Sequence, residues 1–140
     1  MFRSIFYRFS RINSNVRVGY KFSEAFEASI FGTFDKFKSD YDNSFPIQDA
    51  EFVSTSEQYR VGIAPKYTYK NGSVTMNAAY TTIDREFFST FPSTFEGETF
   101  AVDIFNKYNF SNKFFTVVGL NYIDNQTTFA EIASSSIVDP

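Results

Sequence analysis

Bulky apolar residues alternate with small or polar residues along most of this chain. The stretch PKYTYKNGSVTMNAAY shows this alternation on both sides of Asn71 and Gly72. Asn-Gly between two alternating runs is a strong local signal for a β-hairpin. Helical spacing from Val74 would select a mostly polar stripe, whereas every second residue from Val74 to Tyr80 is apolar, which favours strands. The stretch therefore predicts two strands joined by a turn at Asn71-Gly72.

The same period-two pattern recurs in six segments and predicts an all-β antiparallel meander of six to seven strands. The third of these strands contains Pro65, which cannot donate to a ladder, so we expect a β-bulge there. A seventh strand could lie at Phe2 to Phe9, within an ambiguous N-terminal segment of residues 1–15. The six expected strands are Val16 to Phe22, Phe26 to Lys38, Glu57 to Lys70, Ser73 to Arg85, Glu98 to Phe110 and Phe114 to Asn125.

Short and long connections alternate between the expected strands. Transmembrane β-barrels have short turns at one rim and long loops at the other, so three hairpins over residues 16–127 would form a segment of such a barrel. Residues 128–140 are expected to be a truncated loop of the long, extracellular kind. The short turns are Ser23 to Ala25, Asn71-Gly72 and Ser111 to Lys113, and the long polar loops are Ser39 to Ser56 and Glu86 to Gly97.

Aromatic residues gather near both ends of the expected strands. Tyr59 and Tyr69 share one face and lie roughly 33 Å apart along an extended strand. At a tilt of about 40° this is roughly 25 Å of height, which is the height of the apolar band on an outer-membrane barrel. A second aromatic set near the long loops is Phe34, Tyr59, Tyr80, Phe100 and Tyr122. The aromatic girdle expected near the short turns is Tyr20, Phe22, Tyr67, Tyr69, Tyr108 and Phe110.

The opposite face of the strands carries charges of both signs. In a wide barrel these side chains would meet a wet lumen or a polar plug, and in a soluble sandwich they would meet solvent. A small soluble barrel would instead turn the aromatic face inward, so the alternation alone leaves these readings open. The charged residues are Arg17, Lys21, Glu27, Asp35, Arg60, Lys66, Asp103 and Lys107.

Composition supports the β prediction and excludes several functions. The chain has 20 Phe and 9 Tyr, residues that suit a pleated surface, and its single leucine is Leu120. The 13 Lys and Arg against 16 Asp and Glu give a net charge of -3, which argues against a nucleic-acid partner. Histidine and cysteine are both absent from the sequence, so the usual general base, thiolate nucleophile and metal ligands are missing. We therefore expect neither an enzyme nor a bound cofactor or metal.

Aromatic residues of the expected long loops are the candidate ligand contacts. Aromatic side chains offer a large contact area at low entropic cost and could hold a large, partly apolar ligand at the outer mouth of a barrel. The alternative is that they pack among the loops or in the outer girdle. The candidates are Tyr41, Phe45, Phe52, Phe88, Phe91 and Phe95.

Two polar clusters have simpler interpretations. Asp40, Asp42 and Asn43 have spacings that could suit Ca²⁺, but no glycine occupies the turn position and no glutamate closes the loop, which favours a solvated loop. Asp84 to Glu86 forms a charge cluster without a companion carboxylate across a cleft. A salt-bridge network at the rim is the expected role of this second cluster.

Two long phrases carry a family resemblance. RVGIAPKYTYKNGSVTMNAAYTTIDREF and FNKYNFSNKFFTVVGLNYIDNQTTF resemble the barrel region of TonB-dependent outer-membrane receptors of Bacteroidetes-type bacteria, with the vitamin B12 (cobalamin) receptors as the closest subgroup. The resemblance spans roughly Val16 to Pro140. It implies a 22-stranded barrel in bacterial outer-membrane lipid, closed by a plug domain and energised by the TonB complex.

The resemblance also implies a function. This chain would supply barrel wall and outer loops for the import of a small nutrient, cobalamin or another metal chelate. It would not transport alone, because the plug is missing from it. The alternatives are another outer-membrane β-barrel, such as a porin or adhesin, and a soluble all-β ligand-binding domain.

Overall fold

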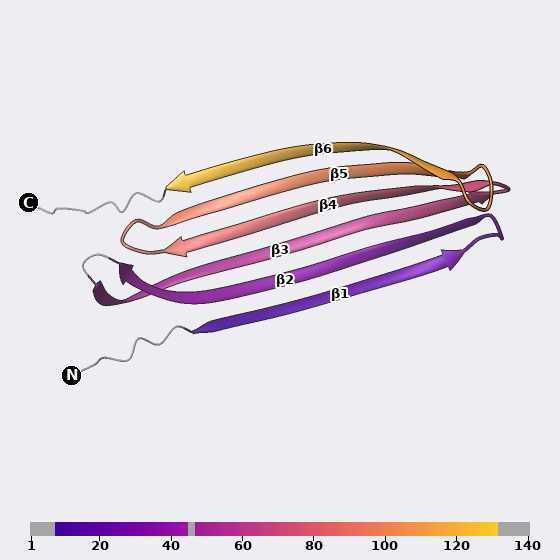
Figure 1. Ribbon diagram of the computed structural model, residues 1–140. Coiled ribbons are helices and arrows are strands. Elements are labelled where there is room, and N and C mark those ends of the chain that lie inside the picture. The colour runs from indigo at the N-terminus through magenta and orange to yellow at the C-terminus, as the bar shows by residue number, and fades with distance from the viewer. Residues whose placement is uncertain (1–7, 45–46, 132–140) are drawn as a thin grey trace, which may run out of the picture.

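The computed structural model describes residues 8–44 and 47–131. They form one antiparallel sheet in which six strands follow their sequence order, with β1 and β6 at the two edges (Figure 1). The predicted all-β antiparallel meander is therefore confirmed. Within the described residues, no helix has the length and apolar character needed to cross a membrane. The strands are β1 (Phe9–Lys21), β2 (Phe26–Ser44), β3 (Ile47–Tyr69), β4 (Gly72–Phe88), β5 (Ser93–Asn109) and β6 (Phe115–Glu131).

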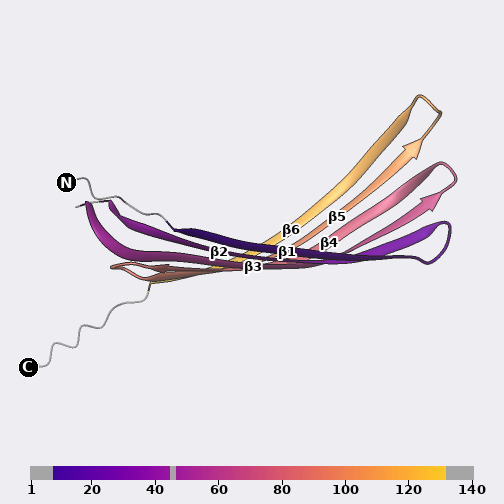
Figure 2. The same ribbon diagram turned by 90° about the horizontal axis from the view of Figure 1, so that it is seen from below.

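The sheet is a single curved layer, as its edge-on view shows (Figure 2). Ala79, at 6% exposure, is the one buried apolar residue in the described part of the chain. Even in the central strand β3, Val61 is 59% exposed. Full burial of one such aliphatic side chain stabilises a protein by roughly 1.5–3 kcal/mol. This chain does not supply that burial itself, because no second layer covers either face of its sheet.

The pairing registers assign every strand residue to one of two faces. Val18 pairs with Ile30, Ile30 with Ile63, Ile63 with Ala78 and Ala78 with Val102. We call the face that carries these residues the band face. The other we call the mixed face. Since neighbours along a strand point to opposite faces, the eight charged residues grouped by the sequence pattern all lie on the mixed face, as predicted.

The prediction of two long polar loops, Ser39 to Ser56 and Glu86 to Gly97, is wrong. Ser39 pairs with Ser54 in the β2–β3 ladder, and most of both segments belongs to strands. Residues 47–61 contain neither glycine nor proline, and polar side chains can extend a strand when water reaches them. Hydrophilicity correlates with loops but does not itself end a strand. The connection between β4 and β5 is therefore only Ser89 to Pro92, and the expected alternation of short and long connections is absent from the described residues.

The ends of the sheet also differ from the expected boundaries. β1 begins at Phe9, so residues 9–15 of the ambiguous segment all extend the first strand. The possible strand at Phe2 to Phe9 falls almost entirely outside the described residues. β6 continues to Glu131, so residues 128–131 of the expected terminal loop are strand. Residues 132–140 lie outside the described part.

The hairpin between β3 and β4 exists, but its turn lies one residue earlier than predicted. Tyr69 pairs with Gly72, so the two turn residues are Lys70 and Asn71. Gly72 is the first residue of β4 and is needed for close approach. A Cβ there would overlap the carbonyl oxygen of Lys107 and lie 2.7 Å from Tyr69 Oη. The Asn-Gly signal found the hairpin, while the glycine serves packing across the strands.

Pro65 causes no bulge. The pairs on either side of it, Ile63 with Ala78 and Lys66 with Thr75, keep the same register, so no residue is inserted. The β3–β4 ladder is simply interrupted at Ala64 and Pro65, while Pro65 remains paired with Ala28 of β2. The strand tolerates the missing N–H donor without a change of register.

The turns that close β1–β2 and β5–β6 share the motif Tyr-x-Phe-Ser-x-x-Phe and the same hydrogen bonds. They read YKFSEAF and YNFSNKF. In the first, Ser23 Oγ accepts hydrogen bonds from the N–H groups of Ala25 (3.2 Å) and Phe26 (3.1 Å). In the second, Ser111 Oγ does the same for Lys113 (3.3 Å) and Phe114 (3.2 Å). The predicted turns at these two places are confirmed.

Candidate functional site: the two faces of the sheet

The band face carries apolar side chains between two rows of aromatic residues. Along β2, Phe26 and Phe34 bracket Ala28, Ile30 and Gly32. Phe34 lies eight positions after Phe26, which is roughly 26 Å along the strand. The valine, isoleucine and leucine residues between the rows, from β1 to β6, are Val16, Val18, Ile30, Val61, Ile63, Val74, Val102, Ile104, Val118 and Leu120.

The row farther from the short turns drifts in one direction across the sheet. Phe34 pairs directly with Tyr59. Tyr80 pairs with Val61, two residues beyond Tyr59, and Tyr80 also pairs with Phe100. Tyr122 then pairs with Val102, two residues beyond Phe100. The row thus shifts by two residues between β3 and β4 and by two more between β5 and β6.

The row near the short turns drifts in the same direction. Phe26 pairs with Tyr67, whereas Tyr69 pairs with Gly72, which in turn pairs with Tyr108. The shifts average one residue per strand. With about 3.3 Å per residue along a strand and about 4.8 Å between strands, the strands are therefore tilted by roughly 35° from the line perpendicular to the aromatic rows. The band is then roughly 22 Å high when measured across its rows.

The aromatic residues predicted as a girdle lie at the turn end of the sheet, and their role as a girdle stays a prediction. Tyr20 and Phe22 meet edge to face with ring centroids 4.9 Å apart, and Tyr108 and Phe110 repeat this geometry at 4.8 Å. The Tyr69 hydroxyl donates to Asn106 Oδ1 at 2.6 Å. The repeated motif Tyr-x-Phe-Ser-x-x-Phe was not recognised from the sequence, although a self-comparison of the chain would have found it.

Polar residues replace the apolar ones on the band face beyond the second aromatic row. Lys36 and Glu57 pair across β2 and β3 and form an ion pair. The hydrogen bond with Glu57 raises the pKa of Lys36 above its usual value. In β4 and β5, the same belt contains Asp84, Glu86 and Glu96. Most residues of this face beyond the second row are therefore polar, with Ile12 of β1 and the pair Val53 and Phe88 of β3 and β4 as apolar exceptions.

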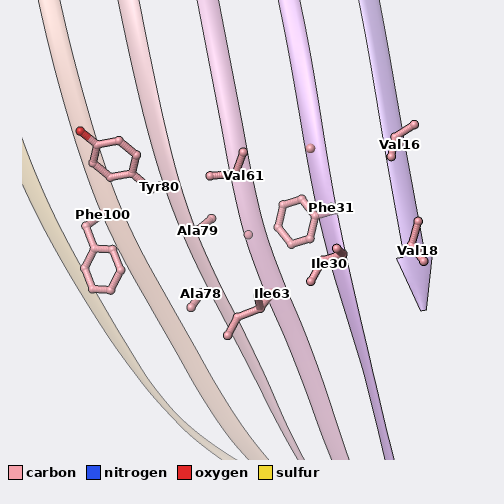
Figure 3. A pocket seen from close by; sticks show the side chains of 12 residues that line it. Val16, Val18, Ile30, Phe31, Val61, Ile63, Ala78, Ala79, Tyr80 and Phe100 are labelled. Carbon is pink, nitrogen blue, oxygen red and sulfur yellow. The ribbon is translucent and has the colours of Figure 1, made fainter. Parts of the chain in front are cut away.

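A shallow apolar hollow lies in the middle of the band (Figure 3). Val16 of β1, Ile30 of β2 and Val61 of β3 are among the residues around it, and Gly32 contributes no side chain. The hollow is open on one side and holds almost no polar surface. It offers van der Waals contact to an apolar chain but no hydrogen-bonding groups for a polar ligand.

The mixed face of β1–β3 is organised by ion pairs between neighbouring strands. Arg11 contacts Asp35 at 2.8 Å, and Asn13 also donates to that carboxylate at 2.8 Å. The hydrogen bond from Arg11 and, to a smaller extent, that from Asn13 lower the pKa of the Asp35 carboxyl. Lys66 contacts Glu27 at 3.3 Å. Both carboxylates of this region are thus occupied by cations.

Two further cations of the mixed face lie against one aromatic ring. The guanidinium carbon of Arg17 is 4.8 Å from the Phe31 ring centroid, and that of Arg60 is 5.7 Å from it. Phe31 lies over Gly62, where a Cβ would overlap the ring. The absence of a side chain at Gly62 leaves room for the Phe31 ring, and both guanidiniums make cation–π contacts with that ring.

The mixed face of β4–β6 is less cationic. Asn121 donates to Asp103, and Thr99 donates to Asn125 at 2.7 Å. Lys107 lies over the ring of Phe115 at 4.8 Å. The two halves of this face therefore differ, because cations are concentrated on β1–β3.

The residues predicted to contact a ligand do not converge on one pocket. Phe52 and Phe95 lie on the mixed face in β3 and β5, while Phe88 ends β4 on the band face and is 51% exposed. Phe91 lies in the turn after β4 and is 86% exposed. Tyr41 belongs to β2, so the loop assignment is wrong for Tyr41, Phe52, Phe88 and Phe95. Phe45 falls outside the described residues, and ligand contact by the whole set stays a prediction.

The structure also changes the interpretation of the two polar clusters. Asp40, Asp42 and Asn43 belong to β2 rather than to a loop, and no group of three or more potential metal ligands occurs within the described residues. The salt-bridge network expected at Asp84, Arg85 and Glu86 is not found among the described residues. In a strand, Arg85 points away from its two acidic neighbours, and its guanidinium lies 5.9 Å from the Phe95 ring centroid.

No protein-family model matches this chain, and no curated protein matches it either.

Proposed function

We propose that this chain is a segment of the wall of a transmembrane β-barrel in the outer membrane of a bacterium. The band between two tilted aromatic rows carries this proposal. Its height of roughly 22 Å and its tilt of roughly 35° agree with the apolar band of about 25 Å and the strand tilt of about 35–45° in outer-membrane barrels. Lipid would contact the band face and replace the missing second layer of protein.

The polar belt and the mixed face support the same arrangement. Most residues of the band face are polar beyond the second aromatic row, where Lys36 and Glu57 begin the polar belt. A protein layer packed on this face would need no such boundary, whereas a bilayer of fixed thickness does. The mixed face, with its ion pairs on β1–β3, would line a wet interior. These features favour a membrane barrel over a soluble all-β domain.

Cysteine substitution at consecutive residues tests this proposal, because the natural sequence contains no cysteine. Ile63→Cys and Val102→Cys would place a thiol on the band face, while Ala64→Cys and Ala101→Cys would place one on the mixed face. With the chain in native outer membranes, a membrane-impermeant maleimide should label the second pair and leave the first pair unlabelled. Equal labelling of both pairs would contradict the barrel wall.

Expression without detergent tests the soluble alternative. A barrel segment with an uncovered apolar band should aggregate in aqueous buffer and dissolve only in detergent or lipid. A stable monomer that unfolds cooperatively in buffer alone would contradict the membrane proposal. This experiment separates the two readings without any assumption about the ligand.

Within the outer-membrane class, we propose a TonB-dependent receptor that imports a small nutrient, such as cobalamin or another metal chelate. The sequence phrases around Asn71 and Ser111 support this finer assignment. Its test is the natural reading frame around the chain, which should encode a plug domain upstream and further strands of about ten residues downstream. A porin or adhesin would lack the plug, and binding of a nutrient would then have to be sought on the complete protein.

A further inference from the structure

We propose that Arg17 and Arg60 form a binding site for an oxyanion that carries two or more negative charges. The two arginines lie on the mixed face in β1 and β3 and are both exposed. Their guanidinium carbons lie 4.8 Å and 5.7 Å from the centroid of the same ring, that of Phe31. The shared ring brings the two guanidiniums to one place on the sheet, where we infer that a single oxyanion contacts both.

The surrounding ion pairs explain why this arginine pair is available to a ligand. Asp35 is bound by Arg11 and Asn13, and Glu27 is bound by Lys66. The described residues contain no ion pair for Arg17 or Arg60. Arg17 donates to the neutral hydroxyl of Ser29, at 3.3 Å. The positive charge of the pair is thus not neutralised by the sheet itself.

Phe31 and Gly62 preorganise the pair. Arg17 and Phe31 are directly opposite each other in the β1–β2 ladder, and Phe31 is opposite Gly62 in the β2–β3 ladder. A side chain at position 62 would displace the ring, since a Cβ there would also lie 2.5 Å from the carbonyl oxygen of Ala78. Stacking on the ring restricts both guanidiniums before a ligand arrives, which reduces the entropic cost of binding.

The chemistry of arginine selects the ligand class. Each guanidinium is a planar fork of N–H donors that matches the oxygens of a carboxylate or phosphate. A monovalent anion would neutralise one arginine and leave the other charge uncompensated. Inorganic phosphate and dicarboxylates share the required chemistry, with several oxygens and at least two negative charges. The site needs a wet mixed face only, so it does not depend on whether lipid covers the band face.

Calorimetric titration of the full chain in a zwitterionic detergent tests the site. We expect inorganic phosphate and succinate to bind at pH 8 and acetate to bind at least about tenfold more weakly, because acetate can satisfy only one guanidinium. Arg17→Gln and Arg60→Gln should each weaken phosphate or succinate binding about five- to tenfold. Stronger binding of phosphate than succinate, or the reverse, would distinguish the two sources of the oxyanion.

Arg85→Gln is the matched control. Arg85 also lies on the mixed face against a phenylalanine ring, that of Phe95, and within the described residues no second guanidinium lies over that ring. This variant should bind the dianions as the natural chain does. An equal loss of affinity in the Arg85 variant would show general attraction to positive charge and overturn the site.

Two further variants keep the test decisive if an Arg→Gln variant does not fold. Arg17→Lys with Arg60→Lys retains both charges without the planar forks, and Phe31→Leu removes the shared ring. Both should fold, as judged by the β-sheet signal in circular dichroism, and both should weaken dianion binding. Unchanged binding in both variants, or no binding of either dianion by the folded natural chain, would overturn the proposal.

Discussion

Val61 and Gly62 are consecutive in β3, yet they belong to surfaces with different physical requirements. Val61 is 59% exposed on the band face, within an apolar zone that the chain leaves uncovered. Gly62, on the mixed face, lies under the Phe31 ring and has no room for a side chain. The band face is specified by hydrophobicity at a defined height, and the mixed face by individual contacts between side chains. Substitutions should therefore have different effects on the two faces.

The largest difference between the two faces should be in the loss of stability caused by an arginine at the centre of each face. Ile63 lies midway between the row residues Tyr59 and Tyr67 of β3, so Ile63→Arg should destabilise the chain in a bilayer by about 2–4 kcal/mol, the usual cost of arginine at the midplane of a membrane barrel. Ala101→Arg lies at a similar level on the mixed face and should cost less than about 1 kcal/mol, because its charge would meet water. Denaturant titration of the chain in phospholipid vesicles measures both values. Similar costs would mean that both faces have the same environment.

Substitution of a crowded glycine should destabilise the sheet more than substitution of a glycine that has room for a side chain. Gly72→Val should impair assembly, at a cost of about 1–3 kcal/mol from overpacking, because even a Cβ there meets the Lys107 carbonyl and the Tyr69 hydroxyl. Gly19→Ala is the control, since its Cβ would have Ser29 Cβ as its nearest neighbour at 3.6 Å. The yield of folded protein and its unfolding midpoint give the readout. Ligand affinity of the folded Gly72 variant should be unchanged, because this turn lies at the opposite end of the strands from the proposed outer mouth.

A single tryptophan should locate the edge of the band with a smaller effect. The natural chain has no tryptophan, so Tyr59→Trp and Ile63→Trp each introduce a unique fluorophore on the band face. Stability of the Tyr59 variant should change by less than about 0.5 kcal/mol, because tryptophan also suits the membrane interface. Lipids brominated near the headgroup should quench the residue at position 59 more strongly than the one at position 63. The reverse order would place the aromatic row away from the interface.

The smallest effect should come from the exposed ion pairs of the mixed face. The Arg11 and Asn13 hydrogen bonds lower the pKa of Asp35 below its ordinary value of 3.8. A carboxyl with a lowered pKa in the folded state contributes stability above pH 4, and this contribution is lost as the pH falls through the folded pKa. Asp35→Asn should remove that part of the acid dependence, measured as the unfolding midpoint between pH 2 and 6. High salt should reduce it in the natural chain.

The sequence predicted the strands and the division into faces because both depend on local alternation. Every expected strand is present, and Arg60 lies on the same face as Lys66 as anticipated. The strand ends were not predicted, since the serine- and threonine-rich continuation of β3 was interpreted as a loop. Whether a polar segment pairs depends on the partner strand, which the pattern of one segment does not contain.

The arginine pair could not be predicted from the sequence for a related reason. Arg17, Phe31 and Arg60 come from three strands, and only the registers of β1–β2 and β2–β3 bring them together. The sequence pattern placed both arginines on one face. The pattern did not show that Arg11 and Lys66 would bind the nearby carboxylates of Asp35 and Glu27 and leave Arg17 and Arg60 without them.

The steady drift of the aromatic rows has a geometric consequence for any closed barrel built from these strands. A drift of about one residue per strand accumulates on going around the barrel, so a closed barrel of this kind would have a shear number about equal to its number of strands. The tilt is already present in β2–β6, in the two-residue steps from Tyr59 to Tyr80 and from Phe100 to Tyr122. The inclination of the wall would therefore be encoded strand by strand, and additional strands would widen the barrel without changing its tilt.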